Sequence, residues 1–492
     1  MKEVKKIAVV GGGTAGYITA LTLARRLNCK IDMIASSKIG IIGVGEGSTE
    51  HFDNFRYAIG ESPIDILRKT NGSLKVGVMF KDWTKEPFMV SNQTPITRRA
   101  GESLFYIEKL IADGKKQKDT SLDAYWNNTV PKWYADPQRN RNKLVPTLQY
   151  HFNTFKLNEY LSNKAKEFGV KMYDDEIVDI KLSKDGSIDK LKGKKKTYKY
   201  DFYIDCTGFR RALLTKLGAK WQSYGKYLKM KAAIAFPTSK PESYNTYTLA
   251  QRMKYGWLWR TPVYDRCGNG YAYDSDYITP EQAQKEAEEY LGHKVEVARS
   301  VKFDPGALDR VWIKNCCAIG LAASFVEPLE ASSIGSAIQQ VFMLMHELPL
   351  YNQKTIDKYN KDAGDLLTNI RDFLIVHYLV KNNDSKFWRD IQKLEIPDYL
   401  QEQLDVWKHR LPLRDDFNHL SRYILFTEAH WTNLLFGIGH FDRKMIKKRF
   451  NGLHKTLQTY GINDIKKEVN FLNSLECMPH KDFLLAVHNN YK

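Results

Sequence analysis

The sequence predicts an α/β fold in which a Rossmann-type dinucleotide-binding module is joined to a mostly helical C-terminal module. A short apolar run, a glycine-rich turn and an amphipathic stretch open the chain in the order of a βαβ unit. From about residue 339 onward the apolar spacing is mostly helical. The 492 residues exceed what one ordinary core organises. We therefore expect a discontinuous first module over residues 1–345, with an inserted sheet, and a second module over residues 346–492.

The βαβ unit is predicted from three consecutive patterns. Residues 7–10 are apolar and mostly β-branched, which indicates a buried strand. Residues 11–16 form the turn, and residues 15–27 place apolar side chains on one face and basic ones on the other, as in a helix that covers a sheet. Residues 31–34 then predict the second strand.

Further elements follow along the first module. Apolar residues recur at helical spacing over residues 157–168. Residues 177–184 and 187–191 predict a hairpin with Asp185-Gly186 at its turn, because this dipeptide favours tight β-turns. Residues 200–205 predict another buried strand.

The formal charge of +18 indicates either attraction to an anion or a solvated lysine-rich surface. The anion would be nucleic acid, a pyrophosphate cofactor or halide. The basic residues are spread along the chain in short groups, such as residues 194–196 and 447–449, and they form no long arm and no nucleic-acid motif. We expect the solvated surface and no nucleic-acid partner.

Several sequence features bound the compartment. The longest apolar runs are too short to span a bilayer, so no membrane contact is expected. The first ten residues lead from lysines into a strand pattern, without the cleavage site of a signal peptide. The six cysteines have neither zinc nor disulfide spacing. We therefore expect a reducing, cytoplasmic environment and no metal site.

The glycine-rich turn has the sequence GGGTAG and lies between a predicted strand and a predicted helix, where a dinucleotide site requires it. Glycines let the backbone approach a pyrophosphate, whose charge the helix N-terminus favours. Without a ligand, the same pattern would be an ordinary turn. Ala35 stands where an acid would hold the ribose, so Ser36 or another segment must do so. The predicted cofactor-binding residues of this unit are Gly11, Gly13, Thr14, Ala15, Gly16 and Ser36.

Two other small-residue turns follow predicted strands. They are DCTG at residues 205–208 and CAIGLAA at residues 317–323, the latter read as a strand that enters a helix. Gly208 and Gly320 would let the chain pass close to the cofactor, although such turns can be purely structural. Three turns in this order favour a two-electron flavin enzyme over a simple dehydrogenase.

More specific patterns lie in the middle of the chain. Residues 256–262, GWLWRTP, resemble the W-x-W-x-I-P signature of flavin-dependent halogenases, with Thr261 in place of the usual Ile. Residues 73–80, SLKVGVMF, followed by Trp83, resemble the catalytic-lysine segment of the same family.

Two further segments add to the resemblance. Residues 43–48, GVGEGS, resemble the V-G-E-A/G-T loop near the flavin, and Gly45 of this loop is expected to bind the cofactor. Residues 325–333, FVEPLEASS, resemble the E-P-L-E-S-T segment, with Ala331 in place of the usual Ser. The chain thus resembles the tryptophan-halogenase family, and its composition is similar to that of phage-encoded members.

The resemblance implies a function. The first module would be a flavin monooxygenase-like FAD-binding module, and the second would bind the substrate. The enzyme would use FADH2 from a separate flavin reductase, with oxygen and halide, to form hypohalous acid and halogenate a small electron-rich aromatic. It further implies the catalytic residues Lys75 and Glu330 and, at a predicted helix start, the halide-binding residues Ser332 and Ser333.

The chemistry of these side chains agrees with the implied roles. Trp257 and Trp259 are two apart in a strand and share one face, so they would separate flavin from substrate unless they are simply core. Lys75, in a segment that alternates like a strand, would donate to hypohalous acid or be N-halogenated, unless it is a snorkelling surface lysine. Glu330 would position the electrophile or take the ring proton, unless it only favours a helix start.

Two other function classes stay open. A flavin-dependent aromatic monooxygenase would hydroxylate an aromatic without needing halide. A non-catalytic basic protein would use a flavin fold to bind nucleic acid or an acidic partner. The sequence leaves the substrate open among tryptophan, another indole and a phenol. It also leaves open the halide preference, the regiochemistry and whether the chain forms a homo-oligomer.

Overall fold

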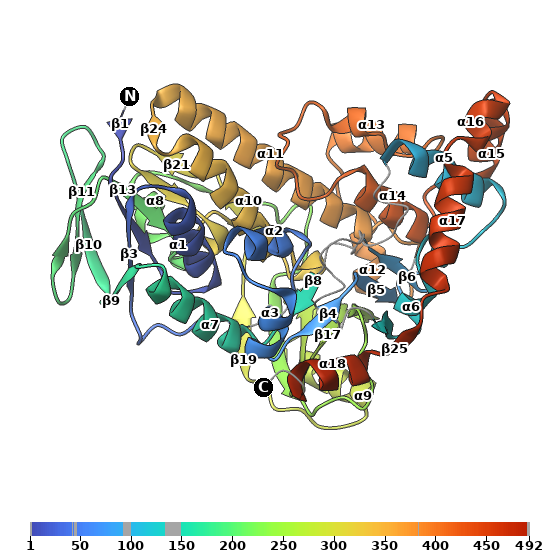
Figure 1. Cartoon of the computed structure of the whole chain (residues 1–492), viewed down its shortest axis with the longest axis horizontal. Helices are drawn as coiled ribbons and strands as arrows, with labels where there is room; N and C mark the ends of the chain where they lie inside the picture. The colour runs from blue at the N-terminus through green and yellow to red at the C-terminus, as the bar shows by residue number, and fades with distance from the viewer. Residues whose placement is uncertain are drawn as a thin grey trace.

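The computed structural model describes residues 2–41, 43, 47–91, 100–132, 149–381 and 383–489. Its first layer is a six-stranded sheet with the order β21-β22-β13-β2-β3-β9 (Figure 1). All neighbouring strands in it are parallel except β21 and β22, which confirms the Rossmann-type prediction. The strands are β2 Lys6–Val10, β3 Lys30–Ala35, β9 Lys171–Asp174, β13 Phe202–Asp205, β21 Trp312–Ile313 and β22 Cys316–Ala318.

Helices cover this sheet, as a parallel sheet that is buried on both faces requires. Helix α1 packs against both α7 and α10, and α8 packs against β22. The central strand β2 is apolar from Ile7 to Val10, and all four of these residues are buried. The helices are α1 Thr14–Arg26, α7 Thr154–Glu167, α8 Ala212–Lys216 and α10 Ser332–Glu347.

A seven-stranded sheet forms the second layer, with the order β19-β15-β18-β17-β16-β5-β6. It is antiparallel except where β16 runs parallel to β5. Its strands are β5 Val78–Lys81, β6 Phe88–Val90, β15 Ala232–Thr238, β16 Thr248–Met253, β17 Gly256–Val263, β18 Arg266–Tyr273 and β19 Arg299–Lys302, and helix α9 Pro280–Leu291 packs on it.

The lysine segment differs from the single alternating strand that its sequence predicts. It splits into β4, Ser73–Lys75, and β5, which belong to different sheets. A Cβ on Gly77 would lie 2.4 Å from the carbonyl oxygen of Val90. Glycine therefore lets the chain pass close to the neighbouring strand and change sheets between the two short strands. Strand β4 pairs with β8, Gln149–His151, in antiparallel register.

The predicted hairpin is confirmed as β10, Ile177–Leu182, paired with β11, Ile188–Gly193, and it projects at the left edge of Figure 1. The remaining short elements before the C-terminal helices complete the loops around the two sheets. They are β1 Lys2–Glu3, α2 His51–Ala58, α3 Pro63–Lys69, α5 Ala100–Ala112, α6 Asp123–Trp126, β7 Thr129–Pro131, β12 Thr197–Tyr198, β14 Trp221–Ser223, β20 Gly306–Leu308 and β23 Ser324–Phe325.

The C-terminal part is mostly helical, as predicted. It is tied to the first part by strands, because β24 pairs with β1 and β25 pairs with β7. Helix α5 from the first part packs against α15 and α17, at the right of Figure 1. The division at residue 345 stays a prediction. The elements are β24 Leu350–Tyr351, α11 Gln353–His377, α12 Lys386–Ile391, α13 Asp398–Trp407, α14 Glu428–Gly437, α15 Arg443–Asn451, α16 Lys455–Thr459, α17 Ile462–Asn473, β25 Cys477–Pro479 and α18 His480–Asn489.

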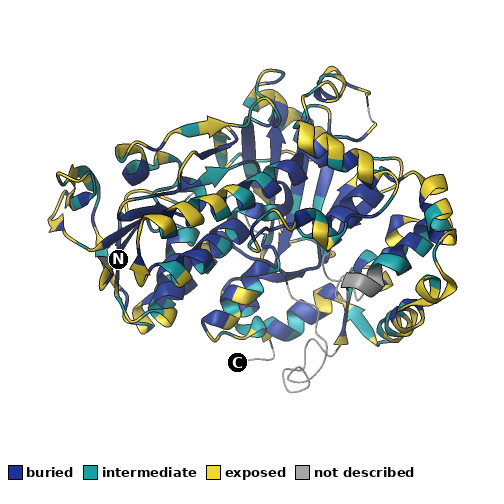
Figure 2. Cartoon of the chain, turned by 90° about the horizontal axis from the view of Figure 1, so that it is seen from above, coloured by how far each residue is buried: buried dark blue, intermediate teal, exposed yellow. Residues whose placement is uncertain are grey.

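Burial follows these layers. The inner strands are dark blue in Figure 2, whereas the outward faces of the surrounding helices are yellow. Among the described residues, no helix combines the length and apolar character needed to cross a membrane.

Candidate active site

The glycine-rich turn joins β2 to α1 with a close-packed backbone. Gly11 has a φ of +125°, and a Cβ there would lie 2.1 Å from the carbonyl oxygen of Cys206. A Cβ on Gly16 would lie 2.1 Å from the Gly11 carbonyl oxygen, so the tight packing within this turn requires glycine at position 16. Gly13 is the N-cap residue of α1 and has no side chain that could accept hydrogen bonds from the first backbone amides of the helix. These amides are therefore available to an anion at the helix N-terminus.

A cavity of about 470 Å³ begins at this turn and ends at the 3₁₀ turn Leu329–Ala331. A Cβ on Gly13 or Gly208 would meet no atom within 4 Å, so both glycines leave open space. Such a cradle fits the pyrophosphate and ring system of a flavin dinucleotide. The predicted site residues that line the cavity are Gly11, Gly13, Thr14, Ala15, Ser36, Gly208, Trp257, Trp259, Gly320, Glu330 and Ser333.

Three predicted site residues do not line the cavity. Gly16 is buried behind the turn, and neither Lys75 nor Ser332 is among the residues that line the cavity. Gly45 lies outside the described residues.

At the carboxyl ends of β3 and β9, the cavity is lined by Ser36 and by residues that the sequence did not indicate. Asp175 and Glu176, just beyond β9, also line it. The Asp175 carboxylate accepts hydrogen bonds from the backbone amide of Lys195 at 3.1 Å and from the Tyr198 hydroxyl at 2.9 Å. It therefore organises the loop. An acidic run directly after a parallel strand was the signal that could have located this end.

The third predicted turn differs in detail from its expectation. Strand β22 leads into a single 3₁₀ turn, Gly320–Ala322, and not into a helix. Gly320 has a φ of +70°, and a Cβ there would lie 2.6 Å from the Ala15 methyl group. The left-handed backbone and this close approach require glycine at the point where the chain passes α1.

Trp257 and Trp259 both face the cavity from β17, which confirms the predicted shared face. Their ring centroids are 5.7 Å apart with an interplanar angle of 51°. A Cβ on Gly270, in the neighbouring strand, would lie 2.1 Å from the Trp259 ring, so this glycine makes room for the indole. The pair forms one wall of the cavity.

A buried carboxyl group is close to this wall. The Tyr378 hydroxyl lies 2.9 Å and 3.0 Å from the two carboxyl oxygens of Glu327. Burial raises the pKa of Glu327 to about 8, against the opposing effect of the tyrosine hydrogen bond. Glu327 is therefore mostly protonated at neutral pH. It belongs to the recognised FVEPLEASS segment, but its own role was not predicted.

Lys75 is only 2% exposed, which excludes the snorkelling surface lysine. Its Nζ donates a 2.6 Å hydrogen bond to the carbonyl oxygen of Ser48. Burial lowers the pKa of Lys75 to about 8, although the carboxylates of Glu330 and Glu50 act in the opposite direction. Lys75 is therefore a buried cation whose charge interacts with those of two carboxylates.

Glu330 precedes α10 and has a left-handed backbone with a φ of +62°, followed by Ala331 at +52°. Two consecutive non-glycine residues in this region store strain, which is typical of functional turns. The carboxylate Oε1 lies 3.0 Å from Nε2 of His377. Nδ1 of His377 lies 2.8 Å from the carbonyl oxygen of Phe373, so it carries a proton that it donates. A hydrogen bond between Nε2 and Oε1 therefore joins His377 to Glu330.

The predicted helix start is confirmed, because α10 begins at Ser332. Ser333 faces the main cavity, whereas Ser332 lines a small hollow next to it with Ser336. His377 was not predicted, because it comes from the end of α11 and has no local pattern that connects it with Glu330.

Comparison with known proteins agrees with this geometry. The family model described as tryptophan halogenase matches residues 6–449, about nine-tenths of the chain. The chain belongs to the tryptophan halogenase family. This family member is 28% identical over 474 residues to tryptophan 6-halogenase SttH of Streptomyces toxytricini, which covers 88% of this chain and 89% of that protein. It is 27% identical over 439 residues to tryptophan 7-halogenase RebH of Lentzea aerocolonigenes, which covers 82% of each protein.

The solved structures give the same assignment. The structure of a tryptophan halogenase from Shewanella frigidimarina superposes with a TM-score of 0.90 at 26% identity, over all of this chain and 98% of that one. The SttH structure superposes with a TM-score of 0.88 at 25% identity. This halogenase-family chain is therefore a flavin-dependent enzyme that acts with FADH2 and halide on an aromatic substrate.

Proposed function

We propose that Lys75 and Glu330 carry the halogenation step of this enzyme. The observation that supports this most strongly is the buried ammonium of Lys75, whose charge interacts with the carboxylate of Glu330, a residue that lines the flavin cavity. Bound reduced FAD supplies, with oxygen and halide, the hypohalous acid that the step consumes. The residues that fit the cofactor are the open glycines of the cradle, Gly13 and Gly208, with Ser36 at the ribose end.

The wall formed by Trp257 and Trp259 keeps the aromatic substrate away from the flavin ring. Their position along the cavity supports this role, because bulky indoles leave little room for a second ring beside the cofactor. Only a small oxidant then reaches Lys75. The wall thereby favours halogenation over direct oxygen transfer to the substrate.

Lys75 acts as the donor that holds and activates the oxidant. Its ammonium donates a proton to the oxygen of hypohalous acid as the halogen–oxygen bond breaks, so water leaves while the carbon–halogen bond forms. Glu330 takes the proton from the ring carbon. The hydrogen bond to His377 holds the Glu330 carboxylate in position. The proton that Glu330 takes from the ring replaces the proton that Lys75 gives to hypohalous acid, so the step balances.

The halide is expected at the start of α10. Backbone amides of Ser332 and Ser333 lie in the first turn of this 16-residue helix, where the helix dipole favours an anion. Ser333 also lines the main cavity, which supports a halide position close to the proposed flavin site.

The remaining features of the function follow from the family. We infer that a separate flavin reductase supplies FADH2, that the substrate is a small aromatic, and that the enzyme works in the cytoplasm. The relatives named above are tryptophan halogenases, and for this chain we keep tryptophan, another indole and a phenol as substrates.

Product analysis of the native protein tests the proposal. The protein is supplied with reduced FAD, oxygen and either chloride or bromide, together with a panel of indoles and phenols. We expect a product whose mass and isotope pattern show one added halogen, and which disappears when halide is omitted. A hydroxylated product that forms equally without halide would instead establish a monooxygenase.

A further inference from the structure

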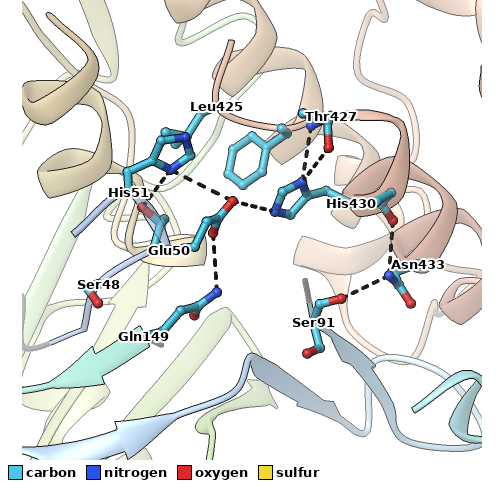
Figure 3. Close-up of polar contacts among 12 residues, drawn as sticks. Ser48, Glu50, His51, Ser91, Gln149, Leu425, Thr427, His430 and Asn433 are labelled. Atoms are coloured by element: carbon cyan, nitrogen blue, oxygen red, sulfur yellow. Dashed lines mark hydrogen bonds and ion pairs between the residues drawn. The ribbon is translucent and has the colours of Figure 1, made fainter. Parts of the chain in front are cut away.

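A second carboxylate, that of Glu50, lies in a cluster of polar side chains (Figure 3), and its charge acts on Lys75. Its Oε1 lies 3.2 Å from Nε2 of His430 and 3.9 Å from Nδ1 of His51. Its Oε2 accepts a hydrogen bond of 3.3 Å from the amide of Gln149. These partners come from α14, α2 and β8, so three separate elements hold one carboxylate in place.

Backbone pairing places this cluster next to the proposed reaction centre. Gln149 is directly opposite Lys75 in the antiparallel pair of β4 and β8, and side chains at opposed positions share a face. The Ser48 carbonyl that accepts from Lys75 lies two residues before Glu50. The charges of Glu50 and Glu330 both act to raise the pKa of Lys75, and both act to raise the pKa of His430. The ammonium of Lys75 is therefore stabilised by the charges of two carboxylates.

The two carboxylates differ in their proton partners. The amide of Thr427 donates a 3.1 Å hydrogen bond to Nδ1 of His430, so Nε2 of this imidazole carries the proton and donates to Glu50. Burial raises the pKa of the Glu50 carboxyl, but His430 and His51 outweigh this and hold it well below its ordinary value. Glu50 is therefore held as an anion by His430 and His51, whereas Glu330 is hydrogen-bonded to a different histidine, His377.

Glu50 is also accessible. Its side chain is 13% exposed, whereas that of His430 is 6% exposed and Gln149 is buried. Within this cluster, a ligand can therefore reach the Glu50 carboxylate, and the neighbouring side chains fix the orientation of this carboxylate. An anion with this exposure and such close partners can bind a hydrogen-bond donor without leaving its place.

We propose that Glu50 binds the aromatic substrate by accepting a hydrogen bond from its ring N–H or O–H group, and so selects indoles and phenols that carry a free donor. The proposal rests on the proposed function and names the substrate class for the same site. A hydrogen bond to a carboxylate moves electron density from the heteroatom into the ring, which makes ring carbons better nucleophiles. The nearby ammonium of Lys75 then presents the halogen to one such carbon. His430 and Gln149 act as positioning residues for Glu50.

Pairs of ring compounds that differ in the donor test this on the native protein. Indole and benzofuran share a shape but only indole has an N–H, and phenol and toluene differ in the same way. Binding is measured by calorimetric titration, which needs no turnover. We expect the donor-bearing member of at least one pair to bind about tenfold more tightly or better, because only that member can add a charge-assisted hydrogen bond to the carboxylate.

Variants then assign the preference to one residue. Glu50→Gln keeps the size but removes the charge, and it should reduce the preference to about threefold or less, roughly a loss of one charge-assisted bond. Glu159→Gln, an exposed carboxylate that pairs with Lys156 on α7, is the matched control and should bind like the parent. Thermal unfolding checks that each variant is folded. If Glu50→Gln does not fold, Glu50→Asp, which keeps the charge but withdraws the carboxylate by one methylene, is the second variant and should also reduce the preference.

The outcomes separate this inference from the proposed function. Halogenated product without any donor preference, or a preference that survives in Glu50→Gln, would overturn the role of Glu50 and leave the halogenase assignment standing. A Glu50-dependent preference without halogenated product would support the binding site and contradict the proposed chemistry. Failure of every pair to show the preference overturns the inference.

Discussion

Burial of the Lys75 ammonium lowers the free energy of unfolding, and the charges of neighbouring carboxylates only partly offset this effect. Its ammonium has one short hydrogen bond to Ser48 and faces two carboxylates, yet its pKa is lowered to about 8 from the ordinary 10.5. Between these values the unfolded chain binds more protons than the folded chain, so the free energy of unfolding rises with pH across this window. Below about pH 8 the full cost, about 3 kcal/mol, is present. Such a cost is typical of a residue kept for function.

Replacement of Lys75 by methionine should remove this pH dependence. The stability of Lys75→Met relative to the parent should fall by about 3 kcal/mol as the pH rises from about 8 to about 10.5, because only the parent loses its burial cost. Urea denaturation at several pH values measures the difference. Lys156→Met, on the surface of α7, is the control and should run parallel to the parent. A Lys75→Met curve that also runs parallel would mean that the buried ammonium is not destabilised.

At the scale of elements, the strand–turn–helix unit divides its glycines into two kinds. Gly11 needs a left-handed backbone and contacts the Cys206 carbonyl, whereas Gly13 has open space in front of it. The first kind is required by the fold, and the second is required by what occupies the cavity.

A matched pair of substitutions separates the two kinds. Gly13→Leu should fold with a melting temperature near that of the parent, but it should bind FAD at least about tenfold more weakly, since the side chain enters the cavity. Gly11→Ala should lower the melting temperature itself, because its Cβ collides with backbone. Fluorescence titration of FAD and thermal unfolding provide the two readouts. Parental FAD affinity in Gly13→Leu would show that this turn does not bind the cofactor.

Elements with a strong local pattern were predictable from the sequence. The β2–α1–β3 unit, the β10–β11 hairpin and the start of α10 each depend on periodicity or on turn residues within a few positions. The break between β4 and β5 was not predictable, because it depends on how closely Val90 approaches Gly77. The same holds for Gly320, where only a residue without a Cβ fits against the methyl group of Ala15.

The reaction centre was predictable only in part. Lys75 and Glu330 belong to recognisable segments, so the sequence located them. His377, His430 and Glu50 reach the same site from α11, α14 and the start of α2, through long-range packing. A single buried histidine in a helix has no local pattern that reveals its partner, so these residues needed the structure.

For the whole molecule, the flavin-binding part and the helical part meet around Lys75. Two strand pairs connect these parts, β1 with β24 and β7 with β25. We propose that residues 346–492 form the substrate-facing module on this frame. The cluster around Glu50 supports this, because His430 from α14 contacts a carboxylate that precedes α2.

The whole chain has one dinucleotide fingerprint, which the flavin cavity uses. We therefore expect no nicotinamide site and a dependence on a separate reductase. Reductase-free protein with FAD, NADH, oxygen and halide should give no halogenated product above the enzyme-free background, whereas added flavin reductase or photochemically reduced FAD should restore it. Turnover with NADH alone would contradict the requirement for a partner.

The central claim is that Lys75 carries the halogenation step, and the ratio of halogenated product to flavin oxidised tests it most directly. Lys75→Ala should oxidise reduced FAD at nearly the parental rate and bind FAD as the parent does, while its product ratio falls by at least about a hundredfold, the usual contribution of a general acid. Glu330→Gln should lower the same ratio without a change in flavin oxidation. A parental product ratio in Lys75→Ala would contradict the account.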